Sequence, residues 1–137
     1  MPAVAMAHDI DPRQAILDKV GDLSGVDVFG SDVLVALYIR PEKTKGGIIL
    51  ADATRQEDLW QGKCGLILKM GSTAFRDEDG YKFRDIDVGD FVVFRPSDGW
   101  PVQFSSAQAV TSKDAVPCRV VNDIHIRLRV STPDAIY

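Results

Sequence analysis

The side chains that could act on a metal or a bound substrate are few in this sequence and lie far apart. Its two cysteines, Cys64 and Cys118, and its two histidines, His8 and His125, lack the short spacings that build a zinc site. We therefore expect no metal site. Two distant thiols fit a reducing compartment in which each packs as a small hydrophobe, although a single disulfide between them is compatible with the sequence.

Acidic residues also occur in pairs, the arrangement that acid–base catalysis uses. Asp77 and Asp79, and likewise Asp85 and Asp87, lie in turn-rich stretches where acidic residues are favoured for conformational reasons. No serine or cysteine stands in a known nucleophile motif, and no glycine-rich phosphate- or dinucleotide-binding motif occurs. The sequence predicts a protein that is not an enzyme and that uses no cofactor.

The segment Gly46-Gly47-Ile48-Ile49-Leu50 is suited to binding another protein. The residues immediately before it include no aromatic or aliphatic side chain, so they have little to bury and we expect a mobile loop. The three aliphatic side chains are costly to leave in water, because fully burying each of them is worth roughly 1.5–3 kcal/mol. An apolar triplet on a mobile loop is what a docking peptide needs.

A competing interpretation treats the same segment as ordinary fold. In it, Gly46-Gly47 forms a hairpin turn and the triplet 48–50 opens a buried strand. The segment alone favours this interpretation, because apolar triplets after paired glycines are common. The rest of the chain favours the docking loop.

Composition sets the class of protein. The chain has 137 residues, of which 45% are hydrophobic, enough for one domain with a core. Its net charge of −4 and the absence of a Lys/Arg cluster argue against nucleic acid or an anionic membrane as the partner. No apolar run is long enough to span a membrane, and the first residues do not resemble a secretory signal.

Local patterns predict one short helix followed by strands. Asp11 can cap a helix, Pro12 suits its first position and Gly21 suits the position after its end. Apolar or alternating residues then predict strands at 33–39, 63–70, 91–94 and 124–130, of which the last is the clearest half-buried strand. A bend or bulge is expected at Gly65. Polar, glycine-marked loops are expected at 71–80, 96–101 and 105–114. Such a chain is mainly β, and it predicts a small antiparallel barrel or sandwich.

In this order the pieces resemble the GroES-type co-chaperonin family. The family has an early strand, a mobile loop with Gly-Gly and three aliphatics, a glycine that restarts the barrel, a Val-Gly-Asp turn before an aromatic-bounded strand, and a last strand containing Asp-Ile. The corresponding stretches here are 32–35, 46–50, 62–63, 88–94 and 121–124. The resemblance implies a GroES-like antiparallel β-barrel with a roof hairpin near the acidic run 77–79.

Three regions depart from the short members of the family. Residues 1–29 form an N-terminal extension with the short helix, the stretch 100–116 is longer than usual, and a tail follows at 131–137, which leaves 30–130 as the barrel domain. These additions are similar to those of a divergent, phage-encoded member.

The resemblance implies a function as well as a fold. Several copies, usually seven, would form a homo-oligomeric ring that caps a GroEL-type chaperonin in the cytoplasm, or in the host cytoplasm for a phage protein. Gly46, Gly47, Ile48, Ile49 and Leu50 would bind the chaperonin, which would itself bind the ATP. The alternative is a small structural or adaptor barrel of a virion or assembly that does not bind chaperonin.

Three other groups of residues have two interpretations each. Trp100 lies where family members often present an aromatic side chain to the folding chamber, but a buried core tryptophan is at least as compatible. The acidic run 77–79 would line the roof of the ring, or would be a plain solvated turn, which we favour. His125, Arg127 and Arg129 are expected on a solvent or subunit-interface face.

Overall fold

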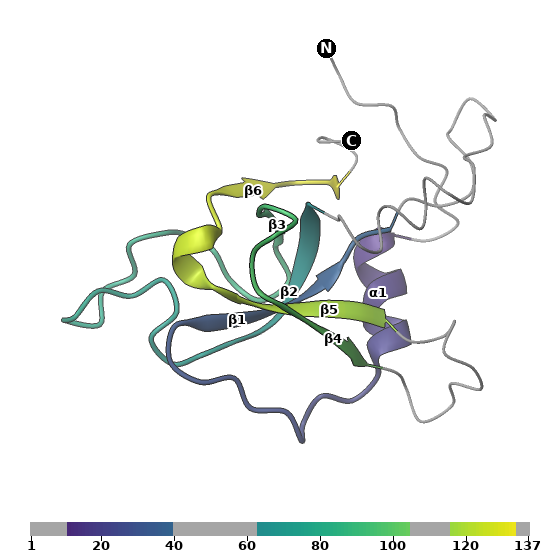
Figure 1. Cartoon of the computed structure of the whole chain (residues 1–137), viewed down its shortest axis with the longest axis horizontal. Helices are drawn as coiled ribbons and strands as arrows, with labels where there is room; N and C mark the ends of the chain where they lie inside the picture. Colours follow the sequence, from purple (N-terminus) through teal and green to yellow (C-terminus); the bar gives the residue numbers. More distant parts are fainter. Residues whose placement is uncertain (1–10, 40–62, 105–115, 134–137) are drawn as a thin grey trace, which may run out of the picture.

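The computed structural model describes residues 11–39, 63–104 and 116–133. Within these ranges the chain forms one short α-helix, a single β-sheet and one turn of 3-10 helix (Figure 1), so the prediction of a mainly β fold is confirmed. The elements are α1 (Pro12–Val20), β1 (Asp32–Leu37), β2 (Cys64–Met70), β3 (Phe91–Val93), β4 (Trp100–Phe104), β5 (Val116–Asn122), η2 (Asp123–His125) and β6 (Leu128–Val130).

The six strands form one antiparallel sheet in the order β4-β5-β1-β2-β3-β6. The longest strands, β1, β2 and β5, lie in the middle, and the short strands lie toward the edges. Among the described residues no ladder joins β4 to β6, so the sheet stays open and the barrel expected from the family resemblance is not closed.

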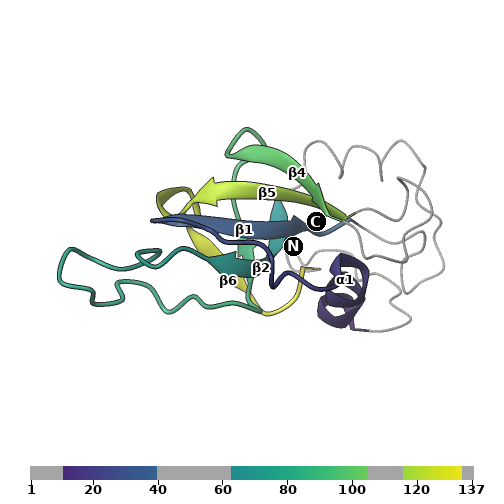
Figure 2. The same ribbon diagram turned by 90° about the horizontal axis from the view of Figure 1, so that it is seen from below.

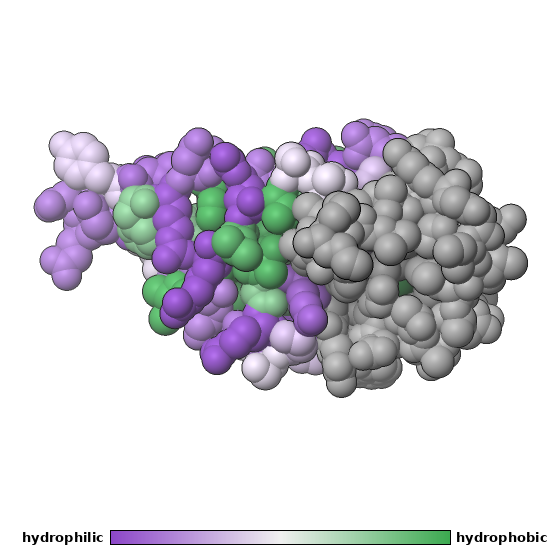
Figure 3. Space-filling model, turned by 90° about the horizontal axis from the view of Figure 1, so that it is seen from above, coloured by the Kyte–Doolittle hydropathy of each residue, from purple (hydrophilic) through white to green (hydrophobic). Residues whose placement is uncertain are grey.

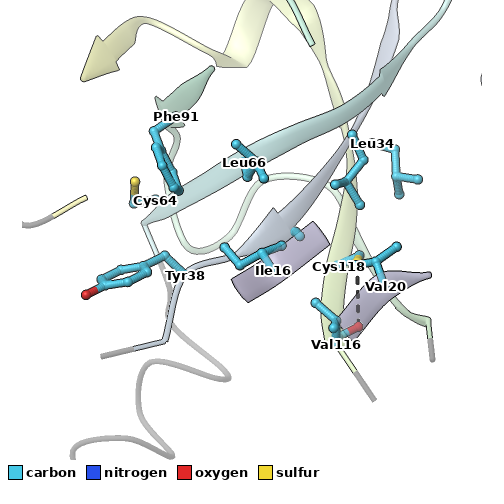
Figure 4. Close-up of a cluster of buried hydrophobic side chains, with 11 residues drawn as sticks. Ile16, Val20, Leu34, Tyr38, Cys64, Leu66, Phe91, Val116 and Cys118 are labelled. Atoms are coloured by element: carbon cyan, nitrogen blue, oxygen red, sulfur yellow. Dashed lines mark hydrogen bonds between the residues drawn. The ribbon is translucent and has the colours of Figure 1, made fainter. Parts of the chain in front are cut away.

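Strand β1 is buried on both faces and divides the core into two clusters. Its residues alternate, so that Leu34 and Ala36 contribute to one cluster and Val33 and Val35 to the other, and all four are at most 1% exposed. Figure 4 shows the first cluster, in which side chains of the sheet face those of the helix. The second cluster is covered by the segments around Phe75 and by the residues that follow β5.

The helix α1 closes the first cluster. The Asp11 carboxylate accepts a hydrogen bond from the Arg13 backbone N–H at 2.8 Å, Pro12 opens the helix, and Gly21 follows it with φ +76°, as the sequence predicts. Ile16 and Val20 are buried against the sheet. Figures 1 and 2 both place α1 at the end of the molecule opposite the hairpin that follows β2.

Gly65 permits a close approach of two strands. The bulge predicted at this glycine lies elsewhere, because the β1–β2 register shifts between Leu34 and Val35, opposite Leu68. A methyl group on Gly65 would stand 2.9 Å from the Ala36 carbonyl oxygen and 3.3 Å from the Phe94 ring. A glycine is therefore required at this position, because the neighbouring strand leaves no room for a side chain.

The prediction of one continuous strand over residues 124–130 is wrong. After β5 the chain turns through η2, and only the last residues form β6, so Ile124 is 62% exposed while Ile126 is fully buried. The Asn122 side chain accepts a hydrogen bond from the Ile124 backbone N–H at 3.2 Å, and the buried Asp123 carboxylate accepts one from Phe75 N–H at 2.8 Å. Side-chain capping at the Asn-Asp pair therefore overrides the alternating pattern.

The sequence patterns do not predict β4 or β5. Arg119 interrupts the apolar run of β5, yet it is only 6% exposed, because its guanidinium lies 5.8 Å from the centre of the Phe94 ring and donates to the Pro96 carbonyl oxygen. A cation that stacks on an aromatic ring can occupy the middle of a buried strand. Strand β4 begins inside the predicted loop at 96–101. The predicted loop at 105–114 lies outside the described residues.

Candidate functional site

The ends of β1 and β2 hold the two ends of the segment 40–62 side by side. Leu37 pairs with Gly65 in the ladder, and one residue further on the Tyr38 backbone N–H donates to the Cys64 carbonyl oxygen at 2.9 Å. On the other side of β2, the Phe94 N–H donates to the Lys63 carbonyl oxygen at 2.9 Å. Tyr38 and Cys64 are both buried, so the segment begins and ends at fixed, neighbouring points of the core (Figure 4).

The docking residues predicted from the sequence belong to this segment. Gly46, Gly47, Ile48, Ile49 and Leu50 lie outside the described residues, and the hypothesis that they bind a partner stays a prediction. The described part of the chain fixes only the two points from which the segment starts and to which it returns.

A hairpin projects from the opposite end of the sheet (Figures 1 and 2). Arg76 and Lys82 form an isolated antiparallel β-bridge. The Asp77 carboxylate accepts hydrogen bonds from the backbone N–H groups of Asp79 and Tyr81 at 3.0 and 2.9 Å. Gly80 has φ +83°, which a glycine adopts without strain. The acidic residues of this turn are exposed, and Figure 3 shows that this end of the molecule is largely hydrophilic, in agreement with a solvated turn.

The turn at Val88-Gly89-Asp90 links the helix to the sheet. Gly89 has φ +95°, and its N–H donates to the Ile67 carbonyl oxygen at 2.9 Å. The Arg13 side chain of α1 donates to the Gly89 carbonyl oxygen at 2.7 Å, and its guanidinium lies 5.4 Å from the centre of the Phe91 ring. The turn that the sequence predicts is confirmed, and it also anchors the N-terminal helix.

A hollow of about 620 Å³ opens beside the point where the segment 40–62 re-enters the sheet. Its described lining combines apolar and positively charged side chains with one carboxylate. Its lining residues are Lys63, Val93, Phe94, Arg95, Pro96, Asp98, His125, Arg127 and Leu128.

The carboxylate of Asp98 is the buried polar centre of this hollow, at 5% exposure. Arg95 donates to it through its backbone N–H at 3.1 Å and through its guanidinium at 3.0 Å. These hydrogen bonds hold the pKa of Asp98 below its ordinary value, against the opposing effect of burial. His125 Nδ1 lies 3.9 Å from the same carboxylate and, among the described residues, has no hydrogen-bond partner although the atom itself is buried.

The cysteines and paired aspartates that could act in catalysis have structural roles instead. Cys64 and Cys118 are free thiols, and burial raises the pKa of each to about 12, so neither is an activated nucleophile. No disulfide joins them. Among residues 11–39, 63–104 and 116–133 no cluster of His, Cys, Asp or Glu could hold a metal ion. Asp85 and Asp87 form ion pairs with Arg129 and Lys82 at 3.7 and 2.6 Å.

The structure separates the remaining candidates. Trp100 begins the edge strand β4 and is 68% exposed, which rules out the buried core tryptophan that the sequence also allowed. His125 and Arg127 line the hollow, whereas Arg129 points to Asp85 and Asp90. Arg127 and Arg129 are exposed and His125 is partly exposed, in agreement with the predicted solvent face, although their neighbours differ. No helix in the described part of the chain is long and apolar enough to cross a membrane.

The sequence analysis missed the Arg95–Asp98 pair and the hollow around it. The sequence Arg-Pro-Ser-Asp-Gly could have indicated this pair, because an Arg and an Asp three residues apart in a turn with Pro and Gly can form an ion pair. The hollow itself could not be predicted, because it forms between β3 and the chain after η2, which are distant in sequence.

This fold and its attachment points define a class of protein: a small antiparallel β-domain that carries a long connection at one end of the sheet and a solvated hairpin at the other. The family model of the chaperonin 10 Kd subunit matches residues 26–119, which is more than half of the chain. The chain therefore belongs to the chaperonin 10 Kd subunit family, a family of co-chaperonins and not of enzymes. No curated protein matches the chain.

Proposed function

We propose that this protein is a co-chaperonin that caps a GroEL-type chaperonin and binds it through Ile48, Ile49 and Leu50. Family membership supports the co-chaperonin role, since the family implies an oligomeric ring and a GroEL-type partner in general. The observation that carries the proposal is the hydrogen bond between the two strands that flank the segment 40–62, which the Tyr38 N–H donates to the Cys64 carbonyl oxygen. A segment whose two ends are held side by side by buried strands is suited to present a binding sequence from a fixed base.

Energetics explain why several copies must act together. Docking three aliphatic side chains is worth about 4.5–9 kcal/mol. Ordering ten or more loop residues costs about 1–2 kcal/mol for each backbone residue. One segment therefore binds weakly, while a ring of copies, usually seven in this family, makes each later contact intramolecular and gains about 10²–10⁴ in avidity.

Weak single contacts also make the cap releasable. A modest change in the affinity of each site, driven by the nucleotide state of the partner, shifts the whole ring between bound and free. The sequence contains no phosphate-binding loop, so the ATP belongs to the chaperonin in this proposal. In this proposal, capping takes place in the cytoplasm, or in the host cytoplasm if the chain is phage-encoded.

Capture by a purified GroEL-type chaperonin with ATP, with ADP and without nucleotide tests the proposal. We expect the full chain to be retained only when nucleotide is present. Native mass spectrometry of the free protein then gives the number of copies in the ring. Retention that ignores nucleotide, or no retention at all, would refute the cap and favour a structural or adaptor protein.

A further inference from the structure

We propose that the hollow between β3 and the chain after η2 is a second contact site for the chaperonin, and that it takes an acidic segment carrying an apolar side chain. This inference rests on the proposed function. The hollow measures about 620 Å³, which lies within the range of about 300–1,000 Å³ found for ligand sites. A short peptide segment with one apolar side chain fits such a volume.

The charges around the hollow favour an anionic occupant. Among the described residues, the lining includes three cations, Lys63, Arg95 and Arg127, and one acidic residue, Asp98. The Asp98 carboxylate is already engaged by Arg95. Arg119 adds a further cation behind the wall, against Phe94. The chain as a whole has a net charge of −4, so this is a local reversal of sign.

Arg127 is the cation best placed to meet a ligand. It lies on the surface, and among the described residues no carboxylate pairs with it. The neighbouring Arg129, two positions along the same strand region, is held instead by Asp85 and Asp90 at 3.7 Å. A guanidinium without a protein partner at the rim of a hollow can bind a carboxylate through two parallel hydrogen bonds.

The walls of the hollow favour an apolar group next to the charge. Val93, Phe94, Pro96 and Leu128 contribute apolar surface, and Leu128 is 57% exposed. An occupant that is only a small anion would leave this apolar surface in water, whereas an acidic segment with an aliphatic side chain covers both.

The position of the hollow identifies the source of that segment. Lys63, the first described residue after the segment 40–62, lines the hollow, and its carbonyl oxygen accepts a hydrogen bond from the backbone N–H of Phe94, another lining residue, at 2.9 Å. Leu50 precedes Lys63 by 13 positions in the sequence (63 − 50), so a chaperonin bound by Ile48, Ile49 and Leu50 would be tethered close to the hollow. A contact here would add electrostatic attraction to the apolar grip of the triplet.

The class of ligand is tested on the full chain with two tripeptides blocked at both ends, Glu-Leu-Glu and Gln-Leu-Gln. Titration followed by NMR should shift the signals of His125, Arg127 and Leu128 with the acidic peptide only. The variant Arg127→Gln should weaken that binding at least about tenfold, the size expected for a charge-assisted hydrogen bond. Equal shifts with both peptides, or an unchanged response in Arg127→Gln, would overturn the inference.

The source of the ligand is tested by nucleotide-dependent capture on the chaperonin. Arg127→Gln should lower the affinity at least about fivefold and reduce its dependence on salt, because it removes a screened charge contact. Arg76→Gln in the hairpin is the matched control and should leave capture unchanged. If wild type and Arg127→Gln are captured equally, the second site is excluded while the cap stands. If wild type is not captured, the proposed function fails and this inference with it.

Discussion

The backbone N–H of Tyr38 donates to the carbonyl oxygen of Cys64 at 2.9 Å, one residue beyond the Leu37–Gly65 pair of the β1–β2 ladder. Both residues are buried at the end of the sheet that α1 covers. The segment 40–62 is therefore attached to the buried ends of two central strands.

Gly65→Ala should destabilise the protein by about 1–3 kcal/mol, because overpacking forces the neighbouring strand to move. The new methyl group would stand 2.9 Å from the Ala36 carbonyl oxygen, a backbone atom with little freedom to shift. Urea denaturation measures the change. Gly25→Ala, where no atom lies within 4 Å of the added carbon, is the control and should stay within about 0.5 kcal/mol of wild type. If Gly65→Ala is as stable as Gly25→Ala, the strands tolerate the methyl group.

Ile16→Ala should cost about 2 kcal/mol or more, since the side chain of Ile16 is 9% exposed within the first core cluster. Leu17→Ala changes the next residue of the same helix, which is 41% exposed, and should cost about 1 kcal/mol or less. Thermal unfolding separates the two. If both variants unfold like wild type, α1 is not part of the core.

The two thiols should be silent in the native protein. Burial raises the pKa of Cys64 and Cys118 to about 12, so almost no thiolate is present at pH 8. We expect a disulfide-forming colour reagent such as dithiobis(nitrobenzoate) to react with neither cysteine until denaturant is added, and then with both. A native thiol that reacts at the rate of free cysteine would contradict the burial of these residues.

Asp98→Asn should lower stability at pH 7 by about 1 kcal/mol, because it removes a charge-assisted hydrogen bond to Arg95. The pKa of Asp98 is lowered in the folded state, so its contribution is complete above its ordinary pKa of 3.8 and is lost as the pH falls through the folded value. The difference between variant and wild type should therefore shrink below about pH 4. Asp79→Asn, in the exposed hairpin turn, is the control. A constant difference across this range would show that Asp98 acts through packing alone.

The sequence predicts those parts of the fold whose signals are local. The cap at Asp11, the turn at Gly89 and the apolar run of β1 depend on neighbouring residues, and all three are confirmed. The hairpin after β2 is marked by its own turn residues in the same way.

Long-range packing decides the rest. Arg119 looks like a surface residue in the sequence, and its contacts with Phe94 and the Pro96 carbonyl oxygen accommodate it inside β5. Asp123 is buried because it binds the backbone of Phe75, which is distant in the chain, and this turns the predicted last strand into η2. The hollow beside Lys63 arises in the same way, from segments that meet only after folding.

Ile49→Asp tests the central claim most directly, through two numbers on the same sample: nucleotide-dependent capture on a GroEL-type chaperonin and the midpoint of thermal unfolding. We predict that capture is lost while the midpoint stays within about 2 °C of wild type. Ile126→Asp, at a fully buried position, marks what a charge in the core does to the midpoint. If Ile49→Asp unfolds the protein as Ile126→Asp does, the triplet belongs to a buried strand; if Ile49→Asp is captured as well as wild type, the triplet is not the docking site.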